Sequence, residues 1–324
     1  INIGTGLRIG NAASSGHYLR GNGTNYVDST IQTTDLPVAS SGQLGVVEGD
    51  GATLSINGSG VISINLAEAA LLIAAEEYRD LDVDAGLTQL DDMATLLKRR
   101  LRADISQADT IAALNHYLFD ELGFAGDSAN YYDPRNSFLN DVLERRRGIP
   151  ITLAIVYIEI GRRIGLPVQG VSFPAHFLVK CALRDGTVVL DSYAKGMSLS
   201  FDDLRRRVKA LKHGAEPTRA MIGNMLAAAS HREILARLLR NLKGIYSHHQ
   251  DWMKALAASD RIIGVMPELA EEYRDRGMIY LNMECFRAAL FDFQAYLKML
   301  PAAKDAQFVT SKVAELEALA SRLN

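Results

Sequence analysis

Residues 149–164 restrict the fold of this chain more than any other stretch, because they are apolar on nearly every side. A helix with that pattern must be buried in the centre of a domain rather than lie on its surface. Gly148 precedes the run, Pro150 suits a first helical turn, and Gly165 is a typical helix end. The run is shorter than the ~20 apolar residues of a membrane helix. We therefore predict a central, buried helix in a soluble domain.

The residues after this helix are typical of a small antiparallel sheet. VQGVSF and AHFLVKCAL alternate as strands, the Asp-Gly pair of RDGT indicates a hairpin turn, and VVLDSY returns as the partner strand. The strand AHFLVKCAL carries His176, and the returning strand ends in Asp191. Cysteine proteases and transglutaminases use the same order: a nucleophile at a helix N-terminus, a histidine base and an orienting carboxylate.

Two longer stretches carry a resemblance to a known family. RRRGIPITLAIVYIEIGRRIGLPVQGVSFPAHFLVK, preceded by YYDPRNSFLNDVLE, closely resembles the SirB-type bacterial invasion regulator family. Its members join a transglutaminase-like core to a tetratricopeptide tail, and the resemblance covers about residues 66–324. It implies a mostly helical α+β fold: a transglutaminase-like (papain-like) core with a small antiparallel sheet, followed by an all-α repeat domain.

The chain departs from active transglutaminase-like enzymes at the nucleophile. Their helix opens with a Gly-x-Cys signature, and laying it on Gly148, Ile149 and Pro150 places proline at the position of the thiol. The SirB-type family commonly shares this Gly-Ile-Pro sequence, and the resemblance supplies no biochemical activity. Thr152 is a weak alternative nucleophile, because a helical threonine more often bonds back to the preceding turn.

Three hypotheses for His176 stay open: a core histidine, the remnant of a lost triad still paired with Asp191, or a working base. Asp191 at a strand end also suits turn capping. Cys181 lies five positions after His176 and would point to the opposite face of a strand, so we interpret it as a core thiol. Ser137 and Ser172 are further hydroxyl candidates, with structural roles as the alternative.

The C-terminal third contains an internal repeat. Three positions recur at a spacing of 34 residues: Tyr246, Ala255 and Pro267 return as Tyr280, Ala289 and Pro301. That spacing is the period of tetratricopeptide helix pairs. We predict two such pairs in residues 231–324 and a closing helix over residues 310–323. The array either binds a partner, with Tyr246 and Tyr280 as candidate binding residues, or packs against the preceding domain.

Residues 1–65 follow a different composition. They hold 12 of the 26 glycines and no Lys, Cys, Met, Phe or Trp. GATLSINGSGVISIN and NYVDSTIQ suggest short strands between turn signals. HYLRGNGTNYVDSTIQTTDLP is similar to the Gly/Ser/Thr-rich segments of phage tail-fibre and related surface proteins. We expect a β-rich or irregular leader, either fused or native, over residues 1–65, a transglutaminase-like domain over 66–225 and a repeat domain over 226–324.

Polar residues ahead of the central helix are candidate binding groups. Asp133, Arg135 and Asn136 precede a helix whose N-terminal amides suit an anion, although turn and cap roles are the alternative. Asn136 or Ser137 is the expected N-cap of the helix that begins near residue 138. The arginine runs 145–147 and 205–207 suit an acidic peptide or phosphate, or else are solvated helix faces.

Charge and cysteine content narrow the function. The net charge of -3 gives no general attraction to nucleic acid or to an anionic membrane. Two distant cysteines indicate free thiols in a reducing compartment, so we expect a bacterial cytoplasmic protein without cofactor or metal. We predict a non-catalytic protein- or peptide-binding regulator of undetermined oligomeric state. The alternatives are an amide-bond hydrolase or acyl transferase that uses His176, Asp191 and a non-cysteine nucleophile, and a structural surface or phage-associated protein.

Overall fold

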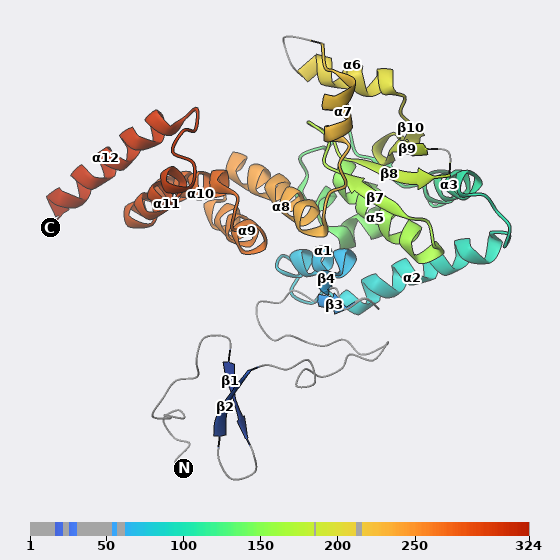
Figure 1. Cartoon of the computed structure of the whole chain (residues 1–324), viewed down its shortest axis with the longest axis horizontal. Coiled ribbons are helices and arrows are strands. Elements are labelled where there is room, and N and C mark those ends of the chain that lie inside the picture. Colours follow the sequence, from blue (N-terminus) through green and yellow to red (C-terminus); the bar gives the residue numbers. More distant parts are fainter. Residues whose placement is uncertain are drawn as a thin grey trace. The chain divides into compact units, whose positions relative to one another are not determined.

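A computed structural model describes residues 17–21, 26–30, 54–56, 62–184, 186–211 and 216–323 (Figure 1). The chain divides into two compact units, residues 1–50 with 54–63, and residues 51–53 with 64–324. The leader contains two pairs of short strands. β1 (His17–Gly21) runs antiparallel to β2 (Tyr26–Thr30), and β3 (Leu54–Ile56) pairs with β4 (Ile62–Ile64). The rest of the leader, including parts of the stretch that resembles tail fibres, lies outside the described residues.

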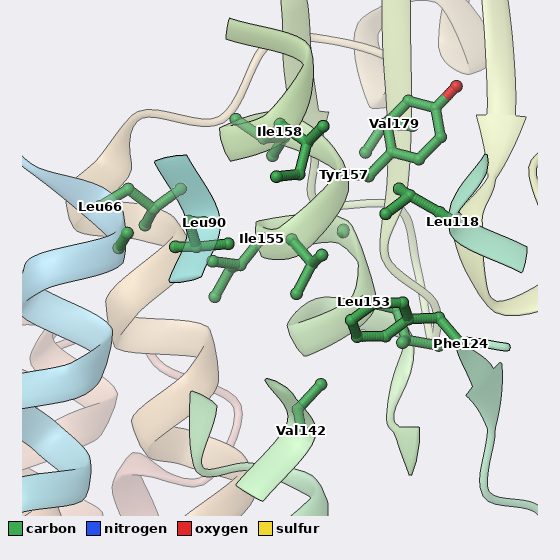
Figure 2. Packing of buried hydrophobic residues seen from close by; sticks show 14 of the residues in the cluster. Leu66, Leu90, Leu118, Phe124, Val142, Leu153, Ile155, Tyr157, Ile158 and Val179 are labelled. Carbon is green, nitrogen blue, oxygen red and sulfur yellow. The ribbon is translucent and has the colours of Figure 1, made fainter. Parts of the chain in front are cut away.

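Helix α5 (Pro150–Ile164) is the centre of the second unit, which confirms the predicted buried helix. Every residue from Pro150 to Gly161 is buried. In Figure 2 its side chains lie among apolar residues of the surrounding elements: Leu66, Leu90, Leu118, Phe124, Val142 and Val179. The helix ends at Gly165, whose φ of +89° favours glycine. Each fully buried Leu or Ile here contributes roughly 1.5–3 kcal/mol.

Among the described residues, four α-helices precede α5: α1 (Leu66–Ala75), α2 (Val83–Arg100), α3 (Gln107–Asn115) and α4 (Leu139–Arg145). Helix α3 continues as a π-helical segment, His116–Glu121. The expected N-cap of α4 was wrong, because the cap residue is Phe138 and makes no side-chain bond. Asn136 belongs instead to a short 3-10 helix, Pro134–Asn136, which Asp133 caps. Asp133 therefore takes the capping role in this turn.

The predicted antiparallel sheet has the strand order β10 (Met197–Ser198), β9 (Gly186–Asp191), β8 (Leu178–Leu183) and β7 (Val168–Val171). Both faces are covered. Val179 and Cys181 belong to the hydrophobic cluster around α5, whereas Leu178 and Val189 pack with helices α6 (Phe201–Leu211) and α7 (Arg219–Met225). The middle of the sheet is thus covered on both faces, whereas β10 and the hairpin end of β8 and β9 are more exposed.

His176 does not lie on a strand, contrary to the sequence expectation, because β8 begins only at Leu178. The preceding residues form a turn in which the His176 N–H donates to the carbonyl of Phe173 at 3.1 Å. Ala175 has a φ of +54°, in the left-handed region. Pro174 lacks an N–H and so cannot extend the ladder at this point. The alternating apolar residues around His176 therefore belong to a turn whose two phenylalanine side chains are buried, and not to a strand.

The tail consists of helix pairs α8 (His231–His248) with α9 (Trp252–Val265) and α10 (Ala270–Asn282) with α11 (Phe286–Met299). This arrangement confirms the predicted two repeats (Figure 1). The closing helix α12 (Ala306–Leu323) begins four residues earlier than expected. In the second pair, a Cβ on Gly277 would lie 2.6 Å from the Phe293 ring, so the two helices touch closely there.

Helix α8 contributes to two hydrophobic clusters. Ile234, Leu235 and Leu238 belong to the cluster around α5, while Leu242 and Tyr246 pack with residues of α1 and α9. The core and the first repeat are therefore joined along a shared helix. Across the described ranges, none of the helices combines the length and the apolar character needed to cross a membrane.

Candidate functional site

His176 and Asp191 meet beside one end of the sheet. Asp191 is the last residue of β9, and His176 lies in the turn before the neighbouring β8. The imidazole Nε2 is 2.9 Å from Asp191 Oδ1. The side chain of Asp191 is 3% exposed and that of His176 is 22% exposed. The Nε2 atom of the ring is thus paired with a buried carboxylate, and the Nδ1 atom makes no bond to Asp191.

Asp191 also binds its own turn and a second cation. Its Oδ1 accepts the N–H groups of Tyr193 at 3.1 Å and Ala194 at 3.3 Å, and its Oδ2 accepts a hydrogen bond from Arg207 at 2.8 Å. Burial by itself raises the pKa of Asp191, but His176 and Arg207 outweigh burial and lower it overall. The carboxylate is therefore ionised at neutral pH. Turn capping and pairing with the histidine occur together.

Arg207 is a site residue that the sequence did not identify. It lies on α6 between the buried Leu204 and Val208, and its side chain is 31% exposed, against 75% for Arg206. The sequence predicts only that the whole run 205–207 either binds an anion or is solvated. The helical spacing to Leu204 was the available signal, because residues three apart share a face.

Arg237 anchors the histidine turn from outside the core. Its guanidinium donates to the carbonyl oxygens of Phe173 at 3.1 Å and His176 at 2.9 Å, and to the Ser172 hydroxyl oxygen at 2.7 Å. Burial lowers the pKa of Arg237. A single arginine on an amphipathic helix carries no sequence signal for this role. Through Arg237, the first repeat helix fixes the backbone of the histidine.

The start of α5 has no thiol in its first turn. Pro150 occupies its first helical position and is buried. The fully buried Thr152 hydroxyl accepts the Ile149 N–H at 3.1 Å, and its own proton has the Asn136 carbonyl at 2.8 Å and the Ile149 carbonyl at 3.1 Å as acceptors. The hydroxyl therefore bonds to the preceding backbone, which is the structural role considered for Thr152.

The other candidate nucleophiles also lack a base. Within the described part of the chain, no hydroxyl or thiol is hydrogen-bonded to the His176 imidazole. Ser137 Oγ is buried and has no partner among the described residues, and Ser172 Oγ is bound by Arg237. Cys181 is a buried free thiol whose pKa is raised by burial, whereas a reactive thiol needs a lowered pKa.

The three candidate binding residues ahead of α4 form one turn. Asp133 Oδ1 accepts the Arg135 N–H at 3.0 Å, and the guanidinium of Arg135 lies 2.7 Å from Asp133 Oδ2. The fully buried Asn136 donates to the Asn130 carbonyl at 2.8 Å and accepts a bond from Arg145 at 3.2 Å. Their role in ligand binding stays a prediction.

The two candidate tyrosines lie apart in the repeat helices. Tyr246 is buried in α8, with the Lys254 ammonium 5.5 Å from its ring centre. Tyr280 is partly buried in α10, with the Arg276 guanidinium 5.9 Å from its ring centre. Both rings pack against cations of their own array, and their role in binding also stays a prediction. The described residues include no cluster of side chains suited to hold a metal ion.

A row of aromatic rings extends from the histidine to the surface, and the sequence reasoning missed it. The Tyr193 ring lies edge-on to His176 at 6.1 Å and to Tyr131 at 6.5 Å, and Tyr131 contacts the exposed Tyr132 at 5.3 Å. A Cβ on Gly126 would lie 2.3 Å from the Tyr193 ring, so glycine is required for this approach. Through these ring contacts, the row extends from the pair of His176 and Asp191 to the exposed ring of Tyr132.

Comparisons with known proteins match both halves of the second unit. A transglutaminase-like superfamily model matches residues 84–240, and a tetratricopeptide repeat model matches residues 242–314. A UPF0162 protein of Xylella fastidiosa is 39% identical over 78% of this chain and 90% of its own length. A UPF0162 protein of Pseudomonas aeruginosa is 32% identical over 72% and 83%, and protein SirB1 of Salmonella typhimurium is 25% identical over 71% and 85%.

Proposed function

Because this chain belongs to the SirB-type UPF0162 family, we propose that it is a non-catalytic protein- or peptide-binding regulator. The observation that carries the proposal is Pro150 in the first turn of α5, where a transglutaminase-like enzyme needs its thiol. A proline side chain cannot attack an acyl group. The two free cysteines favour a reducing bacterial cytoplasm as the location.

The retained His–Asp pair suits a structural role in such a protein. Asp191 forms charged hydrogen bonds with the histidine turn and with α6, and Arg237 on α8 donates hydrogen bonds to the same turn. These contacts join three elements around one buried carboxylate. They support a rigid scaffold next to a repeat array of the kind that commonly binds proteins.

The enzyme alternative needs a non-cysteine nucleophile, and Thr152 is the candidate on helix α5. A threonine nucleophile needs a base within hydrogen-bond reach of its hydroxyl. The acceptors around Thr152 Oγ1 are backbone carbonyls, which cannot take up a proton. Among the described residues, the Thr152 hydroxyl makes no hydrogen bond to His176. The non-catalytic function therefore needs fewer changes to the observed geometry.

One experiment tests both functions. The full-length protein is incubated with a random peptide library, and the retained and released peptides are analysed by mass spectrometry. We expect a selective subset to be retained with unchanged masses. Cleaved, deamidated or cross-linked peptides that disappear with the His176→Ala variant would overturn the non-catalytic proposal. A library recovered without enrichment would overturn the binding role.

A further inference from the structure

A cavity of about 430 Å³ opens beside the first turn of α5. Tyr131, Tyr132 and Ile149 form one wall, and α8 forms the other. Ile149 is the N-cap of α5 and directly precedes Pro150. The cavity is thus lined by the residue that immediately precedes the position at which the sequence predicts a lost nucleophile. Its volume falls in the range of ligand pockets, roughly 300–1,000 Å³.

Helix α8 and its C-cap residue His249 contribute two rows of residues at a spacing of four. One row is Arg240, Gly244 and His248, and the other is Asn241, Ile245 and His249. Residues four apart lie on the same helix face, so these rows form one continuous surface. This surface is on the first repeat, and the opposite wall is on the transglutaminase-like core. The transglutaminase-like core and the first repeat are therefore both needed to form the cavity.

The cavity lining contains basic side chains, of which Arg240 is also paired with Glu272. Among the described residues that line it, one guanidinium and two imidazoles occur, and no carboxylate. Arg240 donates its Nε–H to Glu272 at 2.6 Å, and Glu272 also accepts from Lys243 at 2.6 Å. Among the described residues, the Arg240 Nη groups have no hydrogen-bond acceptor. A guanidinium with free N–H groups is well suited to a carboxylate.

The remaining walls are apolar and aromatic. The Tyr131 and Tyr132 rings contact each other edge-on at 5.3 Å, and Ile149 and Ile245 line the cavity beside them. Such walls favour an aliphatic or aromatic side chain. We propose that the cavity binds a short peptide segment in which a carboxylate lies next to such a side chain. This inference rests on the proposed function and specifies its ligand class.

Gly244 allows a clean test. A Cβ built on this residue meets no atom within 4 Å, and Gly244 lines the cavity, so a leucine side chain at this position would start without a clash and take up space at the cavity wall. Gly264 on α9 is the matched control, because its Cβ also meets nothing within 4 Å and it does not line the cavity. Gly244 is in the interior of α8 and Gly264 is in the last turn of α9, and at helical positions leucine is a better helix former than glycine. Both variants should therefore fold.

The probes are three peptides measured by calorimetry with the full-length protein. They are N-acetyl-Ala-Ala-Leu with a free carboxylate, the same peptide as its amide, and N-acetyl-Ala-Glu-Leu amide. We expect at least one carboxylate peptide to bind the wild type and Gly264→Leu about 10-fold more tightly than Gly244→Leu, and more tightly than the uncharged amide. The free-acid and Glu peptides show whether a chain end or a side chain supplies the carboxylate.

Three results would overturn the inference: equal binding to Gly244→Leu, equal binding of the uncharged amide, or no binding of any probe. These failures are distinct from a failure of the proposed function. If library peptides bind the wild type and Gly244→Leu equally, the binding function stands and this cavity is excluded. If the library peptides are chemically changed, the protein is an enzyme, whatever the calorimetry shows.

Discussion

Replacing Asp191 with asparagine removes the charge at the centre of the site and keeps its shape. In the wild type, Asp191 accepts four hydrogen bonds, from His176, Arg207 and the N–H groups of Tyr193 and Ala194. An asparagine can keep its oxygen towards His176 and the two backbone donors. Its amide nitrogen then faces the Arg207 donor, so the charged bond to Arg207 is lost and two donors oppose each other.

The expected cost follows from these contacts. A hydrogen bond to a charged group contributes about 1.5–3 kcal/mol, and breaking a fully buried ion pair costs about 3–5 kcal/mol. Arg207 is 31% exposed and can turn towards water, which keeps the cost below the upper limit. We therefore expect Asp191→Asn to lower the free energy of unfolding by about 2–4 kcal/mol at pH 7. Asp202→Asn on the same α6, 73% exposed, should cost less than about 0.5 kcal/mol.

The measurement is urea unfolding followed by circular dichroism between pH 3 and pH 7. The pKa of Asp191 is lowered in the folded state, so its contribution is present above the unfolded value of about 3.9 and is lost as the pH falls through the folded value. The gap between wild type and Asp191→Asn should therefore shrink below about pH 4. A variant as stable as the wild type at pH 7, or a gap that persists undiminished at pH 3, would refute this reasoning.

Three further predictions concern other parts of the second unit. Pro150→Cys should introduce a thiol with a pKa below the usual ~8.5, because a helix N-terminus stabilises the thiolate. Alkylation by iodoacetamide at different pH values, mapped to residue 150, measures this pKa. An ordinary pH profile that His176→Ala leaves unchanged would contradict the hypothesis that His176 is the remnant of a triad. Gly277→Ala should destabilise the repeats by about 1–3 kcal/mol in urea, since the new Cβ would lie 2.6 Å from the Phe293 ring, and an unchanged midpoint would argue against that close packing. Arg237→Ala should speed amide hydrogen exchange in the turn of residues 173–177 with unchanged circular dichroism, and unaltered exchange would rule out the anchor.

The helices were predictable because their signals are local or repeated. The apolar run of α5 requires burial on every side, and the spacing of 34 residues specifies paired helices without knowledge of any distant contact. The turn at His176 was missed because its residues alternate like a strand. Pro174 was the overlooked signal, since it cannot donate to a sheet ladder. At this turn, a single proline was a better predictor of the local structure than the alternation of apolar residues.

The site could be predicted only as far as chain order allowed. The succession of helix, histidine and aspartate suggested the pair of His176 and Asp191, whose atoms lie 2.9 Å apart. Arg207 and Arg237 reach the same site from α6 and α8, and no spacing along the chain connects them to it. Such contacts depend on how helices pack in three dimensions. A periodic pattern shows which face of a helix is buried but not which partner that face meets.

Helix α8 has a consequence for how this protein can change in evolution. It supplies Ile234 and Leu238 to the core and Leu242 to the repeats, and the two matching family models meet between residues 240 and 242, inside it. A recombination event that exchanged the repeats at a linker would leave one partner without part of its hydrophobic core. We therefore expect the core and its first repeat to be inherited as one module, and new repeats to be added or lost only beyond α9.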